Sequence, residues 1–391
     1  MFTRTFLPRV AGAELVVHYL ATECAAAGHH VTVLAPGRDR LKLTLPYAIL
    51  PIYGLGDASR RAPDWLRERL YLVQLLAIHR RERFDVLHCH TFYPSGYVGA
   101  LFKRAARVPL VMTSHGGDFT AVAEANYGLG LRPHLRPKLE AALRAADAVT
   151  AISEFIAQET LAVGVDRARV FRIENGVDAE GFERHKHAAP PKEMQALDRQ
   201  DFVVLTVARN HPKKRLADVL EALALLSGGP QRAVGVIVGG GVSQLAPLAR
   251  SLGVAPRVFL LEQIPSRSQL DHSNGLNFPP PELVAAYFAS SAFLLPSLAE
   301  AYPLVILEAM AAGLPVVTTD VTGNHDVVQH GRNGLLVPTH SPQAIADSLT
   351  RLMRDSGLRA GLIAGGRATA SRHTWKAVAS AYMDVYQRVQ H

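Results

Sequence analysis

Cysteine and tryptophan are scarce in this sequence of 391 residues, which holds two of each. Cys24 and Cys89 are too few for a disulfide scaffold, and their scarcity indicates a reducing compartment. No apolar run approaches the roughly 20 residues that span a bilayer. Residues 1–8 carry no apolar stretch typical of a secretory leader. We therefore expect a cytoplasmic protein that meets a membrane, if at all, only at its surface.

Acidic residues are also in the minority. The chain has 34 Asp and Glu against 42 Lys and Arg, which gives a formal charge of +8 and a pI of about 9.6. Such a surplus suits nucleic acid, an anionic membrane surface or a phosphorylated substrate. Nucleic acid is disfavoured because the sequence shows no recognition motif and no surface that interleaves aromatic and basic residues.

Most of the surplus lies between residues 60 and 144, where fourteen basic residues accompany seven acidic ones. A helix is expected at 64–83, and most of its apolar residues are predicted to pack on the domain's own sheet. They are Trp65, Leu66, Leu70, Val73, Leu76 and Ile78. The flanking arginines suit anionic lipid heads, so this region is a candidate for peripheral association with the inner membrane face.

What the sequence does contain is an alternation of short β-branched runs and longer helical patterns. Strands are expected at 31–36, 85–90, 109–114, 148–153 and 170–173, and, after a break, at 202–207, 233–238, 258–261, 292–296, 315–320 and 335–337. Helices are expected at 14–27, 64–83, 138–146, 216–226, 281–290 and 342–354. Apolar strands that alternate with helices predict parallel, doubly wound α/β sheets.

The break predicts two domains. Residues 182–199 are polar, contain two adjacent prolines and are predicted to link an N-terminal domain at 1–181 to a C-terminal domain at 200–374. Each is expected to be Rossmann-like and to present loops at the carboxyl ends of its strands to a central cleft. The first strand is short or missing, since only Phe2–Phe6 precede the turn at Pro8, and we expect that the chain starts a few residues late. Residues 264–280 are long for a connecting loop and are expected to be an insertion.

The strongest candidate site follows the strand expected at 292–296. Its loop carries Glu300, Pro303 favours the start of a helix, and the helix carries Glu308. The N–H groups of the first helical turn form an anion site, so the two carboxylates can hold sugar and ribose hydroxyls with a phosphate between them. The alternative is that Glu300 caps the helix and Glu308 is solvated, and spacing alone does not separate the two.

A second candidate site follows the strand expected at 202–207. The loop at 207–215 contains four cations, which are Arg209, Lys213, Lys214 and Arg215. Cations at the carboxyl end of a strand can neutralise a diphosphate, whereas the alternative is an ordinary exposed basic loop. The glycines at 239–241 end another strand, and Gly240 can pass close to a nucleotide base. They lack the full dinucleotide fingerprint, so NAD is disfavoured.

Weaker candidates lie in the first domain. Gly12 permits backbone to approach a phosphate or sugar, although a single glycine is usually only a turn. His115 follows a buried strand and can hydrogen-bond a substrate hydroxyl, with a buried structural histidine as the alternative. The run His88-Cys89-His90 suggests a metal site, but no partner pair has ligand spacing, so no metal is expected. The sequence also has no Asp-x-Asp motif to hold a divalent ion with a nucleotide sugar.

Together these segments resemble glycosyltransferase family four, a group of retaining GT-B enzymes that use nucleotide sugars. Residues Glu300–Met310 are similar to the family's Glu-x7-Glu signature, and Asn175–Asp178 resemble the segment that ends its first domain. Residues 320–324 and 331–337 are similar to later landmarks. The sequence departs from the family pattern at Ala11 and Ala301, where glycine is common, and at Arg215, where glycine usually follows the lysine.

The resemblance implies a GT-B fold in which the last helix, 375–391, packs back on the first domain. It implies a metal-independent hexosyltransferase without a cofactor, in which Arg209 and Lys214 hold the diphosphate, His115 is the active-site histidine and Glu308 holds the ribose. The donor sugar would be held by Glu300. Further donor-binding residues would be Gly12, Gly240, Ala301, Tyr302, Pro303, Leu304 and Val305.

The expected partners are a nucleotide sugar and a glycan or lipid-linked acceptor of lipopolysaccharide, other cell-surface polysaccharide or glycolipid synthesis. Two alternatives stay open at this point. One is a non-catalytic relative that binds nucleotides or glycans, motivated by the short first strand. The other is a nucleotide-sugar epimerase of the GT-B type.

Overall fold

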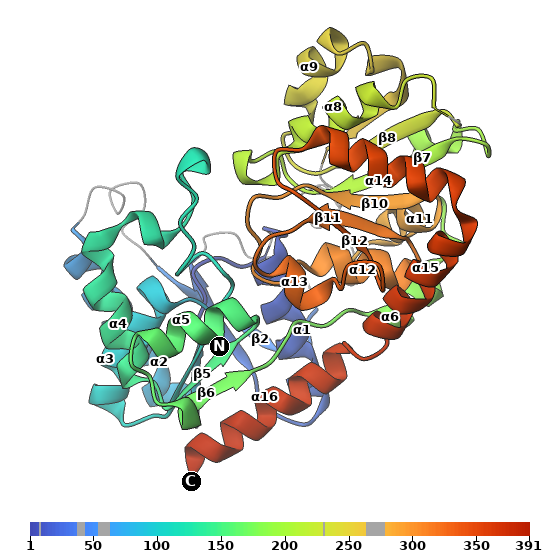
Figure 1. Cartoon of the computed structure of the whole chain (residues 1–391). Coiled ribbons are helices and arrows are strands. Elements are labelled where there is room, and N and C mark those ends of the chain that lie inside the picture. Colours follow the sequence, from blue (N-terminus) through green and yellow to red (C-terminus); the bar gives the residue numbers. More distant parts are fainter. Residues whose placement is uncertain (8, 37–43, 54–62, 230, 263–277) are drawn as a thin grey trace. The chain divides into compact units, whose positions relative to one another are not determined.

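The computed structural model describes residues 1–7, 9–36, 44–53, 63–229, 231–262 and 278–391. The chain forms two compact units (Figure 1). The first comprises residues 1–121, 126–175 and 375–391, and the second comprises residues 122–125 and 176–374. Most of the segment 264–280, predicted to be an insertion, lies outside the described residues.

The predicted linker at 182–199 belongs to the second unit, because the chain divides between Asn175 and Gly176. Helices α6 (Ala179–His185) and α7 (Lys192–Gln195) lie in or overlap this segment. Phe182 is buried, with its ring centroid 5.5 Å from that of Tyr287. Met194 of α7 is buried as well, so the polar composition concealed two apolar anchors, and the division of the chain lies six residues before the predicted domain end at residue 181.

The first unit contains a parallel sheet in two sections. The strands are β1 (Thr32–Pro36), β2 (Ala48–Ile52), β3 (Leu87–Cys89), β4 (Leu110–Ser114), β5 (Ala148–Ala151) and β6 (Val170–Arg172). The sections are β2-β1 and β3-β4-β5-β6, and Phe2 forms a parallel bridge to each. The N–H of Phe2 donates to the His88 carbonyl at 2.7 Å, and the N–H of Thr3 donates to the Leu34 carbonyl at 3.0 Å. The first strand is therefore short, as predicted, and it joins the two sections.

Helices cover this sheet. They are α1 (Gly12–Ala26), α2 (Asp64–Glu82), α3 (Tyr97–Ala106), α4 (Arg136–Ala145), α5 (Glu154–Ala162) and α16 (Trp375–Gln390). The last helix packs against α1, where the ring of Trp375 stacks on Tyr19 with centroids 4.7 Å apart. In the part of the chain that the structure describes, no helix has the length and apolar character needed to cross a membrane.

The second unit contains a six-stranded parallel sheet. Its strands are β7 (Phe202–Val207), β8 (Ala233–Val238), β9 (Val258–Leu261), β10 (Ala292–Leu295), β11 (Val316–Thr319) and β12 (Leu335–Val337). The spatial order is β12-β11-β10-β7-β8-β9 (Figure 1). The order therefore reverses between β7 and β10, which is the position where doubly wound sheets bind their ligands.

The remaining helices of the second unit connect these strands. They are α8 (Leu216–Leu225), α9 (Ala246–Ser251), α11 (Pro281–Phe288), α12 (Leu304–Ala312), α13 (Asn324–Val327), α14 (Pro342–Arg354) and α15 (Ser356–Ala370). Helix α12 is apolar on nearly every side and packs against α6, α11 and α15 as well as the sheet. Its first turn follows the loop that leaves β10, so the core itself fixes where that turn points.

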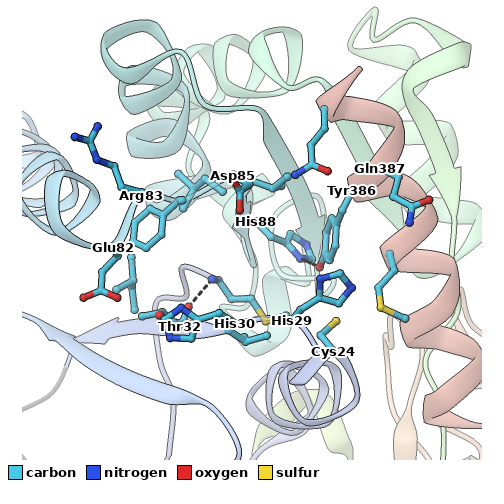
Figure 2. Close-up of a pocket in the computed structure, with 18 residues that line it drawn as sticks. Cys24, His29, His30, Thr32, Glu82, Arg83, Asp85, His88, Tyr386 and Gln387 are labelled. Atoms are coloured by element: carbon cyan, nitrogen blue, oxygen red, sulfur yellow. Dashed lines mark hydrogen bonds between the residues drawn. The ribbon is translucent and has the colours of Figure 1, made fainter. Parts of the chain in front are cut away.

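A cavity of about 230 Å³ lies in the first unit between β1 and β3 (Figure 2). It is lined by Thr32, by residues 82–88 and by Tyr386 and Gln387 of α16. The amino group of Met1 donates to the Thr32 carbonyl there at 2.7 Å. Most of these residues stand at the amino-terminal ends of the strands. The candidate residues follow the carboxyl ends, so this cavity is not the predicted site.

Candidate functional site

Glu300 and Lys214 form an ion pair at the point where the strand order of the second unit reverses. Glu300 lies in the loop that follows β10, and Lys214 lies in the loop that follows the neighbouring strand β7. Lys213 adds a second cation, with its Nζ 3.6 Å from the same carboxylate, and it also donates to the Ala299 carbonyl at 3.3 Å. Both lysines therefore hold the loop that carries Glu300.

The Glu300 carboxylate is ionised at neutral pH. Burial alone would raise its pKa, but the ammonium groups of Lys214 and Lys213 lower it to about 2. The alternative in which Glu300 caps the helix is wrong, because the residue before α12 is Pro303 and no side chain caps that end. An ionised carboxylate beside two cations can accept hydrogen bonds from sugar hydroxyls while the cations face an anion.

The basic loop at 207–215 divides its cations between two tasks. Arg215 directly precedes α8 and pairs with the buried Asp218 of that helix at 2.6 Å, so it serves the fold. Arg209 is exposed, and it stays a prediction for the diphosphate site. Short contacts brace the loop on its other side, where the N–H of Asn210 donates to the Gly240 carbonyl at 2.8 Å.

Gly239 allows that bracing. A Cβ on Gly239 would lie 2.1 Å from the Ala208 carbonyl oxygen and 2.8 Å from the Arg209 nitrogen. Any side chain there would push the basic loop away from its place. Gly323 has the same relation to the other loop, since its Cβ would lie 2.4 Å from the Glu300 carbonyl oxygen, and its φ is +82°. Gly239 and Gly323 thus allow the two charged loops of the site to keep their positions against the neighbouring backbone.

Glu308 is buried one turn into α12. The hydroxyl of Tyr287 donates to its Oε2 at 2.7 Å. Burial raises the pKa of Glu308 to about 7, although this hydrogen bond opposes the rise. The alternative of a solvated helix residue is therefore wrong, and the carboxyl group can exchange a proton near neutral pH.

The start of α12 differs slightly from the prediction. Pro303 is the residue before the helix, which begins at Leu304. The Tyr302 hydroxyl is hydrogen-bonded to His373 at 2.9 Å and its side chain is buried. Donor binding by residues 301–305 would thus depend on backbone N–H groups of the kind that a first helical turn offers.

The first-unit candidates lie at the carboxyl ends of its strands. His115 follows β4 directly, and burial lowers its pKa to about 4, so the imidazole is neutral at pH 7. Gly12 is the first residue of α1, and a Cβ there would meet nothing within 4 Å. Packing within the chain does not demand a glycine at this position, and its role toward a ligand stays a prediction.

The run at 88–90 has partners within the fold. His88 Nδ1 is hydrogen-bonded to the Tyr386 hydroxyl and Nε2 to the Thr113 hydroxyl, both at 2.7 Å. His90 Nδ1 lies 3.2 Å from Nε2 of His115. Both nitrogens of His88 are therefore engaged by hydroxyl groups, which is the structural alternative to a metal ligand.

Several residues of the site were not predicted. They are Lys213 as a partner of Glu300, Tyr287, His90, Gly239 and Gly323. Lys213 and His90 carried a usable signal, since each adjoins a predicted residue at a strand's carboxyl end. Tyr287 carried none, because its contact with Glu308 depends on how α11 and α12 pack.

Comparison with known proteins identifies the family. Residues 10–180 match the family model Glycosyltransferase Family 4, and residues 191–369 match Glycosyl transferases group 1. A D-inositol 3-phosphate glycosyltransferase of Streptomyces bingchenggensis is 32% identical over 320 residues, which cover 79% of this chain and 67% of the relative. Its counterpart in Salinispora arenicola is 33% identical over 328 residues, with coverage of 78% and 68%.

Solved structures share the fold. Sucrose-phosphate synthase from Thermosynechococcus elongatus superposes with a TM-score of 0.80 at 22% identity, covering 99% of this chain and 98% of that one. Anabaena Alr3699/HepE in complex with UDP and glucose gives a TM-score of 0.74 at 21% identity, with coverage of 99% for both. The predicted GT-B class, mixed α/β with parallel sheets in two domains, is confirmed. With its two family matches and these relatives, the chain belongs to glycosyltransferase family 4.

Proposed function

We propose that this glycosyltransferase moves a hexose from a nucleotide sugar to an acceptor with retention of anomeric configuration and without a metal ion. The observation that carries the proposal is the Glu300 carboxylate with Lys214 and Lys213 at the reversal of strand order in the second unit. The relatives of known name transfer glycosyl groups, and a related structure holds UDP-glucose. UDP-glucose is therefore the first donor to test.

The chemical problem is charge separation. The anomeric carbon becomes positive in the transition state while the departing diphosphate becomes more negative. We assign the stabilisation of the leaving group to Arg209, Lys214 and the first-turn N–H groups of α12. Fixed cations supply this charge without a divalent ion, which is the basis of the proposed metal independence.

The two carboxyl groups bind the hydroxyl groups of the donor through hydrogen bonds. Glu300 is ionised and accepts hydrogen bonds from the sugar, while Glu308 accepts them from the ribose. His115 contributes a ring nitrogen to a sugar hydroxyl. These roles require that the Glu300 loop keep its place, which the two lysines and Gly323 provide.

The test is turnover of a panel of nucleotide sugars by wild type and by Arg209→Ala, Lys214→Ala and Glu308→Ala. We expect kcat to fall by about 100- to 1000-fold for the two cation variants, the range seen when one stabilising donor is removed. The matched control is Lys186→Ala, since Lys186 directly follows α6 and pairs with the exposed Glu183 of that helix, and this variant should keep full activity. Wild-type turnover in all three site variants would refute the assignment.

The acceptor proposal begins from α2. Trp65, Arg69 and Val73 stand one helical turn apart on one face, and all three are exposed, Val73 by 63%. The prediction that this apolar set packs on its own sheet therefore fails for Trp65, Leu66 and Val73, while Leu75 of the same helix is fully buried. An apolar stripe that carries arginines supports a lipid-linked acceptor at an anionic membrane surface.

The relatives support a second acceptor class. Their names specify inositol 3-phosphate, and a phosphorylated polyol would suit the same basic surplus of the first unit. Transfer to inositol phosphate in free solution, against transfer only to a lipid-linked glycan in vesicles, separates the two. Free nucleoside diphosphate with an altered sugar and no acceptor product would indicate an epimerase. Nucleotide binding without either product would indicate a non-catalytic relative.

A further inference from the structure

Two histidines of the first unit stand where its strand order reverses. The short segment around Phe2 pairs with β1 on one side and with β3 on the other. The N–H of His90 donates a hydrogen bond to the Phe2 carbonyl at 2.9 Å. His90 is the first residue after β3, and His115 is the first after the neighbouring β4. Both therefore occupy the edge where a doubly wound sheet binds its ligand.

The rings of His90 and His115 meet edge to edge. Their planes differ by only 8°, and His90 Nδ1 lies 3.2 Å from His115 Nε2. The ring centroids are 5.4 Å apart. This equals the nitrogen–nitrogen distance plus about one ring radius for each imidazole, as expected when two rings lie edge to edge in nearly one plane. In-plane N–H and lone-pair directions then point along the line between the nitrogens, as a hydrogen bond requires.

His90 is held from behind by His88. The two rings pack with centroids 4.0 Å apart. His88 cannot turn without losing a bond, because Tyr386 of α16 and Thr113 of β4 engage its two nitrogens. Figure 2 shows His88 and Tyr386 pointing toward each other. The orientation of the His90 ring is therefore determined by α16 and β4 together.

One hydrogen bond joins His90 to His115, and the surroundings of His90 determine which of the two rings donates it. Burial lowers the pKa of both imidazoles, so each ring is neutral and carries one N–H. His90 Nε2 is buried and has no partner among the described residues. A proton on that nitrogen would be an orphaned N–H, which folded proteins rarely contain. The His90 proton therefore belongs on Nδ1, where it donates to His115 Nε2.

His115 then carries its own proton on Nδ1. Within the described part of the chain this nitrogen has no hydrogen-bond partner. It is not one of the buried side-chain atoms that lack a partner, so it is accessible at the surface of the unit. It is the end of the ring that a ligand can reach. The bond from His90 thus decides whether His115 offers a donor or an acceptor to that ligand.

We propose that His90 is a positioning residue that holds His115 in the Nδ1-protonated form, so that His115 donates a hydrogen bond to a hydroxyl oxygen of the bound sugar. This inference rests on the proposed transferase function for the identity of the ligand. The arrangement of the two rings does not depend on that function, and the two can be tested apart.

The first experiment reads the tautomer directly. Histidine labelled with ¹⁵N in the full chain gives two-bond nitrogen–proton correlations that report which ring nitrogen is protonated, with the His115 signals assigned through their loss in His115→Gln. We expect wild-type His115 to be protonated on Nδ1 and His90→Leu to lose this preference. A wild-type His115 protonated on Nε2 overturns the proposal. Absence of any sugar transfer by wild type would count against the proposed function alone.

The second experiment separates hydrogen bonding from packing. His90→Leu removes both ring nitrogens with similar volume, and His90→Asn keeps an amide near the position of Nδ1. We expect His90→Leu to lower kcat by about 10- to 100-fold, by analogy with the loss seen when hydrogen-bond partners behind metal-binding imidazoles are removed. The donor KM should change much less, and His90→Asn should recover most of the loss.

The matched control is His79→Leu. His79 Nδ1 accepts a hydrogen bond from the N–H of Phe84 at 3.0 Å. Phe84 lies just before β3, at the amino-terminal end of that strand and away from His90. Its variant should keep wild-type kcat. Equal kcat in His90→Leu and His90→Asn would overturn the proposal. If His90→Leu does not fold, the wild-type tautomer and His90→Asn decide the question.

Discussion

The carboxyl group of Glu308 illustrates how burial determines protonation at the scale of one residue. Its pKa is about 7 in the folded chain against an ordinary value of 4.5. The unfolded chain releases this proton at lower pH, so the fold binds more protons between those two values. The free energy of unfolding therefore falls as the pH rises from about 4.5 to about 7, and this loss persists above 7.

Glu308→Gln should remove that loss. We expect the variant to lie within about 1 kcal/mol of wild type at pH 5 and to exceed it in unfolding free energy by about 3 kcal/mol at pH 8, since one pKa unit corresponds to about 1.4 kcal/mol. Urea unfolding at the two pH values measures the difference. A difference that does not change between pH 5 and pH 8 would contradict the assigned burial.

Glu300 affects the pH dependence of stability in the opposite direction. Its pKa of about 2 lies below the ordinary 4.5, so its pairing with the lysines stabilises the fold above about pH 4.5 and is lost as the pH falls toward 2. Glu300→Gln should lower the unfolding free energy by about 3 kcal/mol at pH 7 because it leaves the buried Lys213 and the partly buried Lys214 facing a neutral group. The deficit should shrink on acidification. Glu183→Gln, which breaks an exposed pair, should leave stability at pH 7 unchanged.

At the scale of elements, the loops after β7 and β8 depend on one another. A Cβ on Gly239 would overlap the Ala208 carbonyl, whereas a Cβ on Gly253 would meet nothing within 4 Å. Both glycines have positive φ, at +156° and +69°, so Gly253→Ala is a control for backbone strain alone. We expect Gly239→Ala to raise the donor KM by at least about tenfold by displacing Arg209. Gly253→Ala should keep the wild-type KM, and equal effects of the two variants would show that the loops are independent.

Helix α15 shows why some elements escaped prediction. It contains Gly357, Gly361, Gly365 and Gly366, a composition that argues against a helix. Packing explains the last two, since a Cβ on Gly365 would lie 2.1 Å from the Arg332 carbonyl oxygen and one on Gly366 3.2 Å from Met310. Close approach of α15 to α12 and to the segment before β12 therefore outweighs local propensity, and periodicity alone carries no sign of it.

At the scale of the whole molecule, the strands of both sheets were largely predictable because most of them are short apolar runs, and the central ones are buried on both faces. The gathering of the charged residues that follow such runs could also be predicted, because parallel strands end at one edge. The strand β2 was missed since Ala48–Ile52 contains Pro51 and most of its side chains are only partly buried. Pairings such as Lys213 with Glu300 could not be predicted, since they depend on which loops the sheet order makes neighbours.

The basic surplus of the first unit leads to a prediction about membranes. We expect the protein to bind vesicles that contain anionic lipid and to release them as salt is raised, because exposed charges are screened within about 10 Å at 0.1 M salt. Trp65→Ala combined with Arg69→Ala should weaken sedimentation with vesicles by about tenfold. Leu225→Ala, which removes an exposed apolar side chain of the second unit, should not. Binding that is absent or indifferent to salt would exclude this surface.

The placement of α16 has a consequence for synthesis of the protein. The first unit takes its last helix from residues 375–391, after the 176–374 segment of the second unit. At about 5–20 residues per second, a ribosome needs roughly 10–40 s to translate that intervening stretch. During this interval α1 leaves Tyr19 and its apolar neighbours without the cover that Trp375 provides. The nascent first unit is therefore incomplete until α16 has been synthesised, and its uncovered apolar surface would be a binding site for chaperones during that time.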